Sequence, residues 1–190
     1  MAYILGVDIG TSGTKTVLFS EDGTPVASAT YEYPLYTPQN GYAEQEPLDW
    51  WNASVNGIKD VISQSNVSAD DIKGVGLSGQ MHGLVMLDAE NQPIRKSIIW
   101  CVAEITDKVG ADRMIEITAN PAITGFTAAK IMWVKNNEPQ NYEKCRHILL
   151  PKDYIRFMLT GEFATEVSDA SGMQLLDIPN RCWSDEVLNK

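Results

Sequence analysis

The hydrophobic positions at the start of the chain predict three consecutive strands. Residues 3–7, 16–20 and 25–33 are rich in β-branched and aromatic side chains, and glycine-containing turns separate them. Asp22 and Gly23, between the second and third segments, form a dipeptide that is typical of a hairpin turn. The chain therefore begins with an antiparallel run of strands.

An amphipathic helix is predicted after a polar stretch at residues 38–46, which we expect to be a loop. Apolar residues then recur at intervals of three and four, at Leu48, Trp51, Val55, Ile58 and Ile62. This spacing places them along one face of a helix, and we expect that face to cover the sheet.

The rest of the chain predicts further strands and then mainly helices. Strands are expected at residues 75–77, 84–87, 97–100 and 147–150, and helices at residues 111–117, 128–136 and 154–159. Gly161 suits the end of the last of these helices, and Ser184 suits the start of another. Because the sequence ends at Lys190, little more than a turn later, we expect the chain to be cut within a helix.

Length and charge narrow the classes of function. The chain has 190 residues, which indicates one large domain or one domain with an appendage. Its 15 basic and 25 acidic residues give a net charge of −10, which opposes attraction to nucleic acid or to anionic membranes. We therefore expect neither as a partner, and an anionic small ligand would need local donors or a metal.

Cysteine usage and the absence of a targeting signal favour a cytoplasmic protein. Cys101, Cys145 and Cys182 are odd in number and lack CxxC spacing, which disfavours a disulfide framework or a thiolate zinc site. The N-terminus has no basic residue before Lys15, and the longest apolar run, residues 98–103, is too short to span a membrane.

Residues 8–15, Asp-Ile-Gly-Thr-Ser-Gly-Thr-Lys, have the composition of a phosphate-binding hairpin. The glycines let backbone amides approach an anion, the hydroxyls and the lysine donate to phosphoryl oxygens, and Asp8 can orient Mg²⁺ directly or through water. The spacing is not that of a Walker loop. A plain polar turn needs fewer of these residues. The candidate phosphate contacts are Gly10, Thr11, Ser12, Gly13, Thr14 and Lys15.

Residues 74–79, Gly-Val-Gly-Leu-Ser-Gly, formally fit the dinucleotide pattern GxGxxG. The glycines fall within a predicted strand, however, and a second strand follows where a dinucleotide site needs a helix. We interpret them as positions of close backbone packing beside a ligand cleft.

The loop at residues 78–83, Ser-Gly-Gln-Met-His-Gly, follows that strand and is the second candidate site. Polar side chains at a strand end face the cleft of an α/β protein, and Gln80 and His82 can bind a polyol. Trp100 ends a neighbouring strand, and its ring suits either a sugar face or the core.

Together these motifs resemble the FGGY carbohydrate kinases, and in particular their xylulokinase branch. Residues 8–15 resemble the family's first phosphate motif, and residues 125–137 resemble its first signature, with Thr127, Lys130, Trp133 and Asn136 in place. Residues 78–83, 149–156 and 168–172 are more similar to xylulokinases than to glycerol kinases or gluconokinases. The resemblance spans almost the whole chain.

The resemblance implies an α/β, actin- and hexokinase-like fold with a mixed sheet of the ribonuclease H type flanked by helices. Residues 1–190 would be the first of two domains enclosing a cleft. Asp8 and the hairpin would face ATP and Mg²⁺, and Met81 and His82 would contact D-xylulose, with Gln80 and Trp100 nearby. The reaction would transfer the γ-phosphoryl group to the sugar's terminal hydroxyl.

Two departures from the family pattern predict an inactive chain. Family members continue after the tryptophan with a polar Asp-Gln-Arg segment, whereas Trp100-Cys101 here leads directly to Val102, so a short segment is either deleted or left unobserved. The general base also belongs to the second, C-terminal domain. An apolar interface for that missing partner domain predicts self-association into a homodimer. The alternatives are a gluconokinase or glycerol kinase type, or a non-catalytic nucleotide or sugar binding module.

Overall fold

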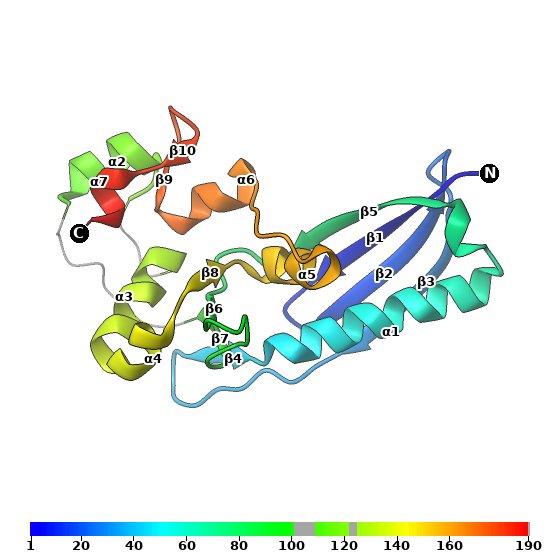
Figure 1. Ribbon diagram of the computed structural model, residues 1–190, viewed down its shortest axis with the longest axis horizontal. Helices are drawn as coiled ribbons and strands as arrows, with labels where there is room; N and C mark the ends of the chain where they lie inside the picture. Colours follow the sequence, from blue (N-terminus) through cyan, green and yellow to red (C-terminus); the bar gives the residue numbers. More distant parts are fainter. Residues whose placement is uncertain (101–108, 122–124, 190) are drawn as a thin grey trace.

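A four-stranded mixed sheet forms one end of the molecule (Figure 1). In the computed structural model, which describes residues 1–100, 109–121 and 125–189, the strand order is β3-β2-β1-β5. Strands β1 (Tyr3–Ile9), β2 (Gly13–Ser20) and β3 (Pro25–Glu32) are antiparallel neighbours, while β5 (Ile72–Gly79) runs parallel to β1. The three predicted N-terminal strands and the mixed character of the sheet are confirmed.

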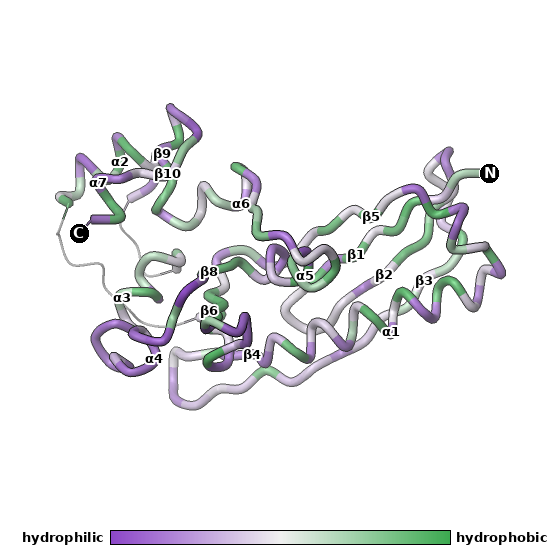
Figure 2. The backbone as a smooth tube through the Cα atoms, viewed as in Figure 1, coloured by the Kyte–Doolittle hydropathy of each residue, from purple (hydrophilic) through white to green (hydrophobic). Residues whose placement is uncertain are grey.

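Helix α1 (Pro47–Ser65) packs along β2 and β3 and confirms the predicted amphipathic helix (Figure 1). Hydrophobic and hydrophilic segments alternate along its length in Figure 2. The buried face differs from the predicted stripe, however, because Leu48 is 44% exposed. The buried residues are Pro47, Trp50, Ala53, Ser54, Gly57 and Val61.

Small residues define that face because helix and sheet approach each other closely. A Cβ atom on Gly57 would lie 2.4 Å from Thr16 Oγ1, which is well inside ordinary contact distance. A pattern based on apolar residues alone does not identify small buried residues such as Gly57.

Two short strand pairs extend the structure beyond the large sheet. Strand β4 (Ala43–Gln45) pairs with β7 (Ser97–Trp100), and β6 (Val85–Leu87) pairs with β8 (His147–Leu149). The predicted strands at residues 84–87, 97–100 and 147–150 are confirmed. The prediction of an unbroken loop at residues 38–46 is wrong, because β4 lies within it.

Helices dominate the C-terminal half, as predicted. Helices α2 (Ala111–Thr118), α3 (Thr127–Asn137) and α5 (Pro151–Thr160) correspond to the three predicted ones. Gly161 ends α5 in the left-handed region with φ of 76°, and Ser184 caps α7 (Asp185–Leu188). Elements without a prediction are η1 (Ala69–Asp71), α4 (Pro139–Lys144), α6 (Val167–Ala170), η2 (Ser171–Met173), β9 (Leu176–Asp177) and β10 (Cys182–Trp183).

The main hydrophobic core lies under one face of the large sheet. Val7 and Ile9 point into it and pack with Trp50 of α1 and with Tyr154 and Ile155 of α5. Because side chains alternate along a strand, Asp8 lies on the opposite, exposed face of β1. The core thus fixes the strand that carries the first predicted site residue.

The glycines of residues 74–79 lie inside β5, and a turn and then β6 follow it. This order excludes the dinucleotide loop, which needs a helix directly after the strand. The predicted close packing is correct only at Gly79, where a Cβ would lie 3.2 Å from the Lys152 Cβ. It is wrong at Gly74, which has no atom within 4 Å of that position.

Cys145 is a half-buried free thiol, and Cys182 is an exposed free thiol. Cys101 and the expected missing segment after it lie outside the described residues. No helix in the described part of the chain is long and apolar enough to cross a membrane.

Candidate active site

The hairpin between β1 and β2 turns its carbonyl groups inward and leaves backbone N–H groups at its tip. Gly10 N donates to Gly13 O over 3.1 Å, which closes the turn. The N–H groups of Thr11 and Ser12 donate to no other group in the described residues. Free amides in a glycine-containing turn are the donors that an anionic oxygen needs.

Two buried side chains hold this hairpin from behind. Tyr33 Oη donates to Gly10 O over 2.6 Å, and Gln45 Nε2 donates to Thr11 O over 2.7 Å. Burial raises the pKa of Tyr33 to about 12, so the hydroxyl keeps its proton at neutral pH. With both carbonyls fixed, the tip amides face outward.

Gly13 is required at its position by a close backbone contact. A Cβ there would lie 2.7 Å from the carbonyl oxygen of Tyr31 on the neighbouring strand β3. Thr14 differs from the sequence interpretation, because its side chain is fully buried and its hydroxyl donates to Tyr33 Oη over 3.4 Å. That hydroxyl therefore points into the core.

Asp8 and Lys15 lie opposite each other in the register of β1 and β2, and both are exposed. They line a hollow of about 360 Å³ on the open face of the sheet, together with Leu77 and Ser78 of β5. The structure therefore brings the predicted carboxylate and cation together at one end of the hairpin.

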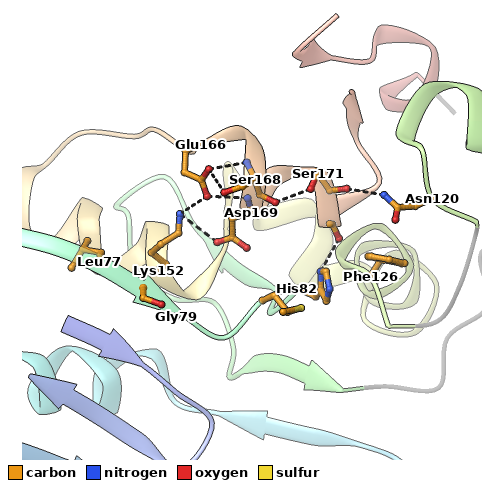
Figure 3. Close-up of a pocket in the computed structure, with 13 residues that line it drawn as sticks. Leu77, Gly79, His82, Asn120, Phe126, Lys152, Glu166, Ser168, Asp169 and Ser171 are labelled. Carbon is orange, nitrogen blue, oxygen red and sulfur yellow. Dashed lines mark hydrogen bonds and ion pairs between the residues drawn. The ribbon is translucent and has the colours of Figure 1, made fainter. Parts of the chain in front are cut away.

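A larger cavity of about 640 Å³ lies beyond the C-terminal end of β5 (Figure 3). It contains two of the predicted sugar contacts, Met81 and His82. Its lining residues are Leu77, Ser78, Gly79, Met81, His82, Asn120, Phe126, Lys152, Glu166, Ser168, Asp169, Ser171 and Gly172.

His82 is fixed in this cavity by contacts on several sides. Its ring Nδ1 lies 2.9 Å from Gly172 O, and its carbonyl accepts from Lys130 Nζ over 2.5 Å. The Phe126 ring meets it edge-on with centroids 4.7 Å apart. A carbonyl oxygen only accepts, so Nδ1 carries the proton and Nε2 is an acceptor.

The backbone and charge state of His82 are also unusual. Its φ of 65° lies in the left-handed region, which a non-glycine residue adopts at some strain. Burial lowers the pKa of His82, and the positive charge of Lys130 adds to this effect. The imidazole is therefore neutral at pH 7 and able to accept a hydrogen bond from a hydroxyl.

Gln80 and Trp100, also predicted near the sugar, do not line this cavity. Gln80 Nε2 donates to Gln45 Oε1 over 2.8 Å, so the side chain supports the hairpin. Trp100 ends β7 opposite Ala43 and is 55% exposed.

The far wall of the cavity comes from residues to which the sequence assigned no role. Lys152 lies in the first turn of α5, and Glu166, Ser168 and Asp169 lie at the start of α6 or within it (Figure 3). These residues fall in segments that carried the family resemblance, but nothing in their local spacing indicated a site.

Three carboxylates lie close to the ammonium group of Lys152. Its Nζ lies 3.1 Å from Glu166 Oε1, 3.4 Å from Asp169 Oδ2 and 3.6 Å from Asp153 Oδ1. Burial alone would lower the pKa of Lys152, but the hydrogen bond to Glu166 and the nearby negative charges outweigh it and raise the pKa. The lysine remains charged.

The pKa values of the Glu166 and Asp169 carboxylates shift in opposite directions. A hydrogen bond from the Ser168 hydroxyl, with help from Lys152, lowers the pKa of Glu166 to about 2. Burial raises the pKa of Asp169, and the charge of Lys152 offsets part of that shift. Glu166 also accepts from the Ser168 and Asp169 amides, so it caps α6.

No group of three or more metal-binding side chains occurs among the described residues. A divalent ion at this site would therefore need oxygen ligands from a bound phosphate or water besides Asp8. Mg²⁺ commonly binds in this way, through one or two carboxylates and substrate phosphates.

The chain is similar in sequence to proteins of a known family. Residues 3–190 match the profile of the N-terminal domain of the FGGY family of carbohydrate kinases. The chain is 42% identical to the xylulose kinase of Bacillus subtilis over 198 residues, covering 100% of this chain and 39% of that protein. It is 40% identical to the xylulose kinase of Escherichia coli over 191 residues, covering 97% and 39%.

Solved structures agree with the fold. The xyloylose kinase of Brucella ovis superposes with a TM-score of 0.93 at 39% identity, covering 98% of this chain and 40% of that chain. The gluconate kinase of Lactobacillus acidophilus gives 0.88 at 27% identity, covering 99% and 39%. The predicted actin- and hexokinase-like fold is confirmed. The chain spans about two fifths of the length of these relatives.

Proposed function

Because this chain belongs to the FGGY family of carbohydrate kinases, we propose that it is the N-terminal domain of an ATP-dependent kinase of the xylulokinase type. The reaction is transfer of the γ-phosphoryl group of ATP to the terminal hydroxyl of D-xylulose. The observation that carries this proposal is the pair of sites at neighbouring strand ends, namely a hairpin with free amides and a cavity lined by Met81 and His82.

The hairpin residues fit a phosphate chain and its metal. The free amides of Thr11 and Ser12 and the Lys15 side chain would donate to phosphoryl oxygens, and Asp8 would hold Mg²⁺ directly or through water. When bound, the metal neutralises charge on the phosphates. The chain's own contribution is to present these donors in a fixed arrangement, since Tyr33 and Gln45 hold the turn.

The cavity residues fit a neutral sugar. His82 Nε2 would accept from one hydroxyl, and the exposed Met81 side chain would cover part of the carbon skeleton. Fixing the sugar relative to the phosphate site lowers the entropic part of the barrier, which is a large share of catalysis in phosphoryl transfer.

The general base is not assigned to any residue of this chain. We propose that a second domain supplies it, together with the adenosine contacts, and that closure of the two domains excludes water from the site. Turnover by the 190 residues alone would contradict this part of the proposal, and measurement of the intact mass of the natural protein shows whether a second domain follows.

The test is a coupled kinase assay on the natural protein with D-xylulose, D-gluconate and glycerol. We expect D-xylulose to be the preferred acceptor, and preference for either of the other two would favour a different member of the family. A binding module without turnover would give sugar affinity but no ADP.

Replacement of Asp8 by alanine tests the hairpin. We expect Asp8→Ala to lower kcat by on the order of 100-fold or more with less than about a threefold change in the KM for xylulose. Asp112→Ala, which removes an exposed carboxylate from α2, is the matched control and should leave both constants unchanged. A variant that raised only the sugar KM would contradict the assignment of Asp8.

A further inference from the structure

The carboxylate of Asp169 lines the cavity, and contacts within the folded chain do not satisfy all of its hydrogen-bonding capacity. Its side chain is 11% exposed, and its buried Oδ2 accepts no hydrogen bond from the described residues. The nearest cation, Lys152 Nζ, lies 3.4 Å away as an ion pair. Because Oδ2 is buried beside Lys152, only the exposed part of the Asp169 side chain can meet a molecule in the cavity.

The neighbouring Glu166 shows the contrast. Its two oxygens accept from Ser168 N over 2.7 Å, from Asp169 N over 2.9 Å and from Lys152 Nζ over 3.1 Å. Glu166 is thus occupied by the capping of α6, whereas Asp169 is not. Lys152 is shared between them and keeps the Asp169 side chain in one place.

The position of Asp169 matches that of a ligand contact. In Figure 3 its carboxylate lies between Lys152 and His82, on the cavity side of the α6 segment. His82 Nε2 is an acceptor, and the carboxylate is an acceptor as well. Two acceptors that line one cavity suit a molecule with several hydroxyl groups.

The charge of the cavity narrows the class of molecule further. Lys152 contributes one positive charge, Glu166 and Asp169 contribute two negative charges, and His82 is neutral. Behind this wall, Asp153 contacts both Lys152 and Arg156. The lining is therefore net negative, and it repels a sugar acid more than a neutral sugar.

We infer that Asp169, positioned by Lys152, accepts a hydrogen bond from a hydroxyl of the sugar and makes the cavity select a neutral ketose over a sugar acid. This inference rests on the proposed function and adds a specificity-determining residue to it. The hydroxyl involved is one that is not phosphorylated.

The experiment compares the wild-type natural protein with Asp169→Asn and with the control Asp177→Asn. Asp177 is the matched control because its carboxylate accepts from Asn180 and lies outside the cavity. KM and kcat are measured for D-xylulose, for its 1-deoxy, 3-deoxy and 4-deoxy analogues, and for D-gluconate. Thermal melting shows that each variant is folded.

We expect Asp169→Asn to raise the KM for xylulose by about 10-fold, because the hydroxyl then meets a neutral amide oxygen in place of a charged carboxylate. For one deoxy analogue the variant and the wild type should have the same KM, since the partner hydroxyl is already absent. The preference for xylulose over gluconate should fall in the variant and stay unchanged in the control.

An unchanged xylulose KM in Asp169→Asn, or equal losses with all three deoxy analogues, would overturn the inference while the proposed function stands. A wild type that phosphorylates gluconate and not xylulose would overturn both. If Asp169→Asn does not fold, Asp169→Ser is measured in the same way, with the same outcomes.

Discussion

Replacement of Gly172 by alanine tests whether His82 is held in place by its fit against η2. A Cβ on Gly172 would lie 2.2 Å from His82 Cε1 and 2.5 Å from Nδ1. Carbon atoms in contact are separated by about 3.5–4.0 Å, so the imidazole must move by more than about 1 Å. That movement breaks the 2.9 Å hydrogen bond from Nδ1 to the Gly172 carbonyl.

The expected loss follows from these two contacts. Overpacking of a filled site costs about 1–3 kcal/mol, and a lost hydrogen bond costs about 0.5–1.5 kcal/mol. We therefore expect Gly172→Ala to lower the free energy of unfolding by about 2–4 kcal/mol. Displacement of His82 by about 1 Å should also reduce kcat/KM for xylulose by on the order of 100-fold.

The assays are urea denaturation followed by tryptophan fluorescence, and the coupled kinase assay. Gly74→Ala is the matched control, because no atom lies within 4 Å of its Cβ position and its φ is not positive. We expect that control to change stability by less than about 1 kcal/mol.

A double-mutant cycle with His82→Ala separates the proposed cause from other effects. When the imidazole is absent, the alanine at position 172 has space, so its effect on unfolding should nearly vanish. An equal loss of stability in both backgrounds would refute the reasoning, because the strain would then come from the backbone of η2.

Two further predictions concern stability. Gly57→Ala should destabilise the chain by about 1–3 kcal/mol, because its Cβ would lie 2.4 Å from Thr16 Oγ1. Thr16→Ala should restore part of that loss in chemical denaturation, since the Cβ at position 16 remains 3.0 Å away. Glu166 has its pKa lowered to about 2, so its ionised form stabilises the folded chain above the ordinary pKa of 4.5. The difference in unfolding free energy between wild type and Glu166→Gln should therefore be constant near neutral pH and shrink as the pH falls from about 4.5 towards 2; a difference that did not change with pH would contradict the assignment.

Elements with strong local patterns were predictable from the sequence, and elements fixed by distant partners were not. Strands β1, β2 and β3 carry their own hydrophobic pattern and turns, so their positions followed from local chemistry. Strand β4 has three residues and exists because β7, more than fifty positions later, pairs with it. No local signal within residues 43–45 contains that information.

In the candidate site, too, one part could be predicted from the sequence and another part could not. The hairpin residues are contiguous, so their glycines and hydroxyls indicated a phosphate site directly. The cavity wall is assembled from α5, α6 and η2, and the Lys152–Asp169 pair exists only after these elements pack together. The motif predicted Thr14 as a phosphate contact, but it did not show where the side chain points. Side chains alternate along β2, and this alternation places the Thr14 side chain in the core.

The placement of Gln80 gives the two sites a common support. Its backbone N–H donates to Ile9 O over 2.7 Å, at the end of β1 and just before the hairpin. Its side chain donates to Gln45 Oε1 over 2.8 Å, and Gln45 in turn donates to Thr11 O over 2.7 Å. Because Met81 and His82 follow Gln80 directly, this chain of hydrogen bonds connects the cavity to the hairpin through the buried side chain of Gln45. Phosphoryl transfer depends on the relative position of donor and acceptor, so under the proposed function Gln80 would help to set the distance between the phosphate site and the sugar site.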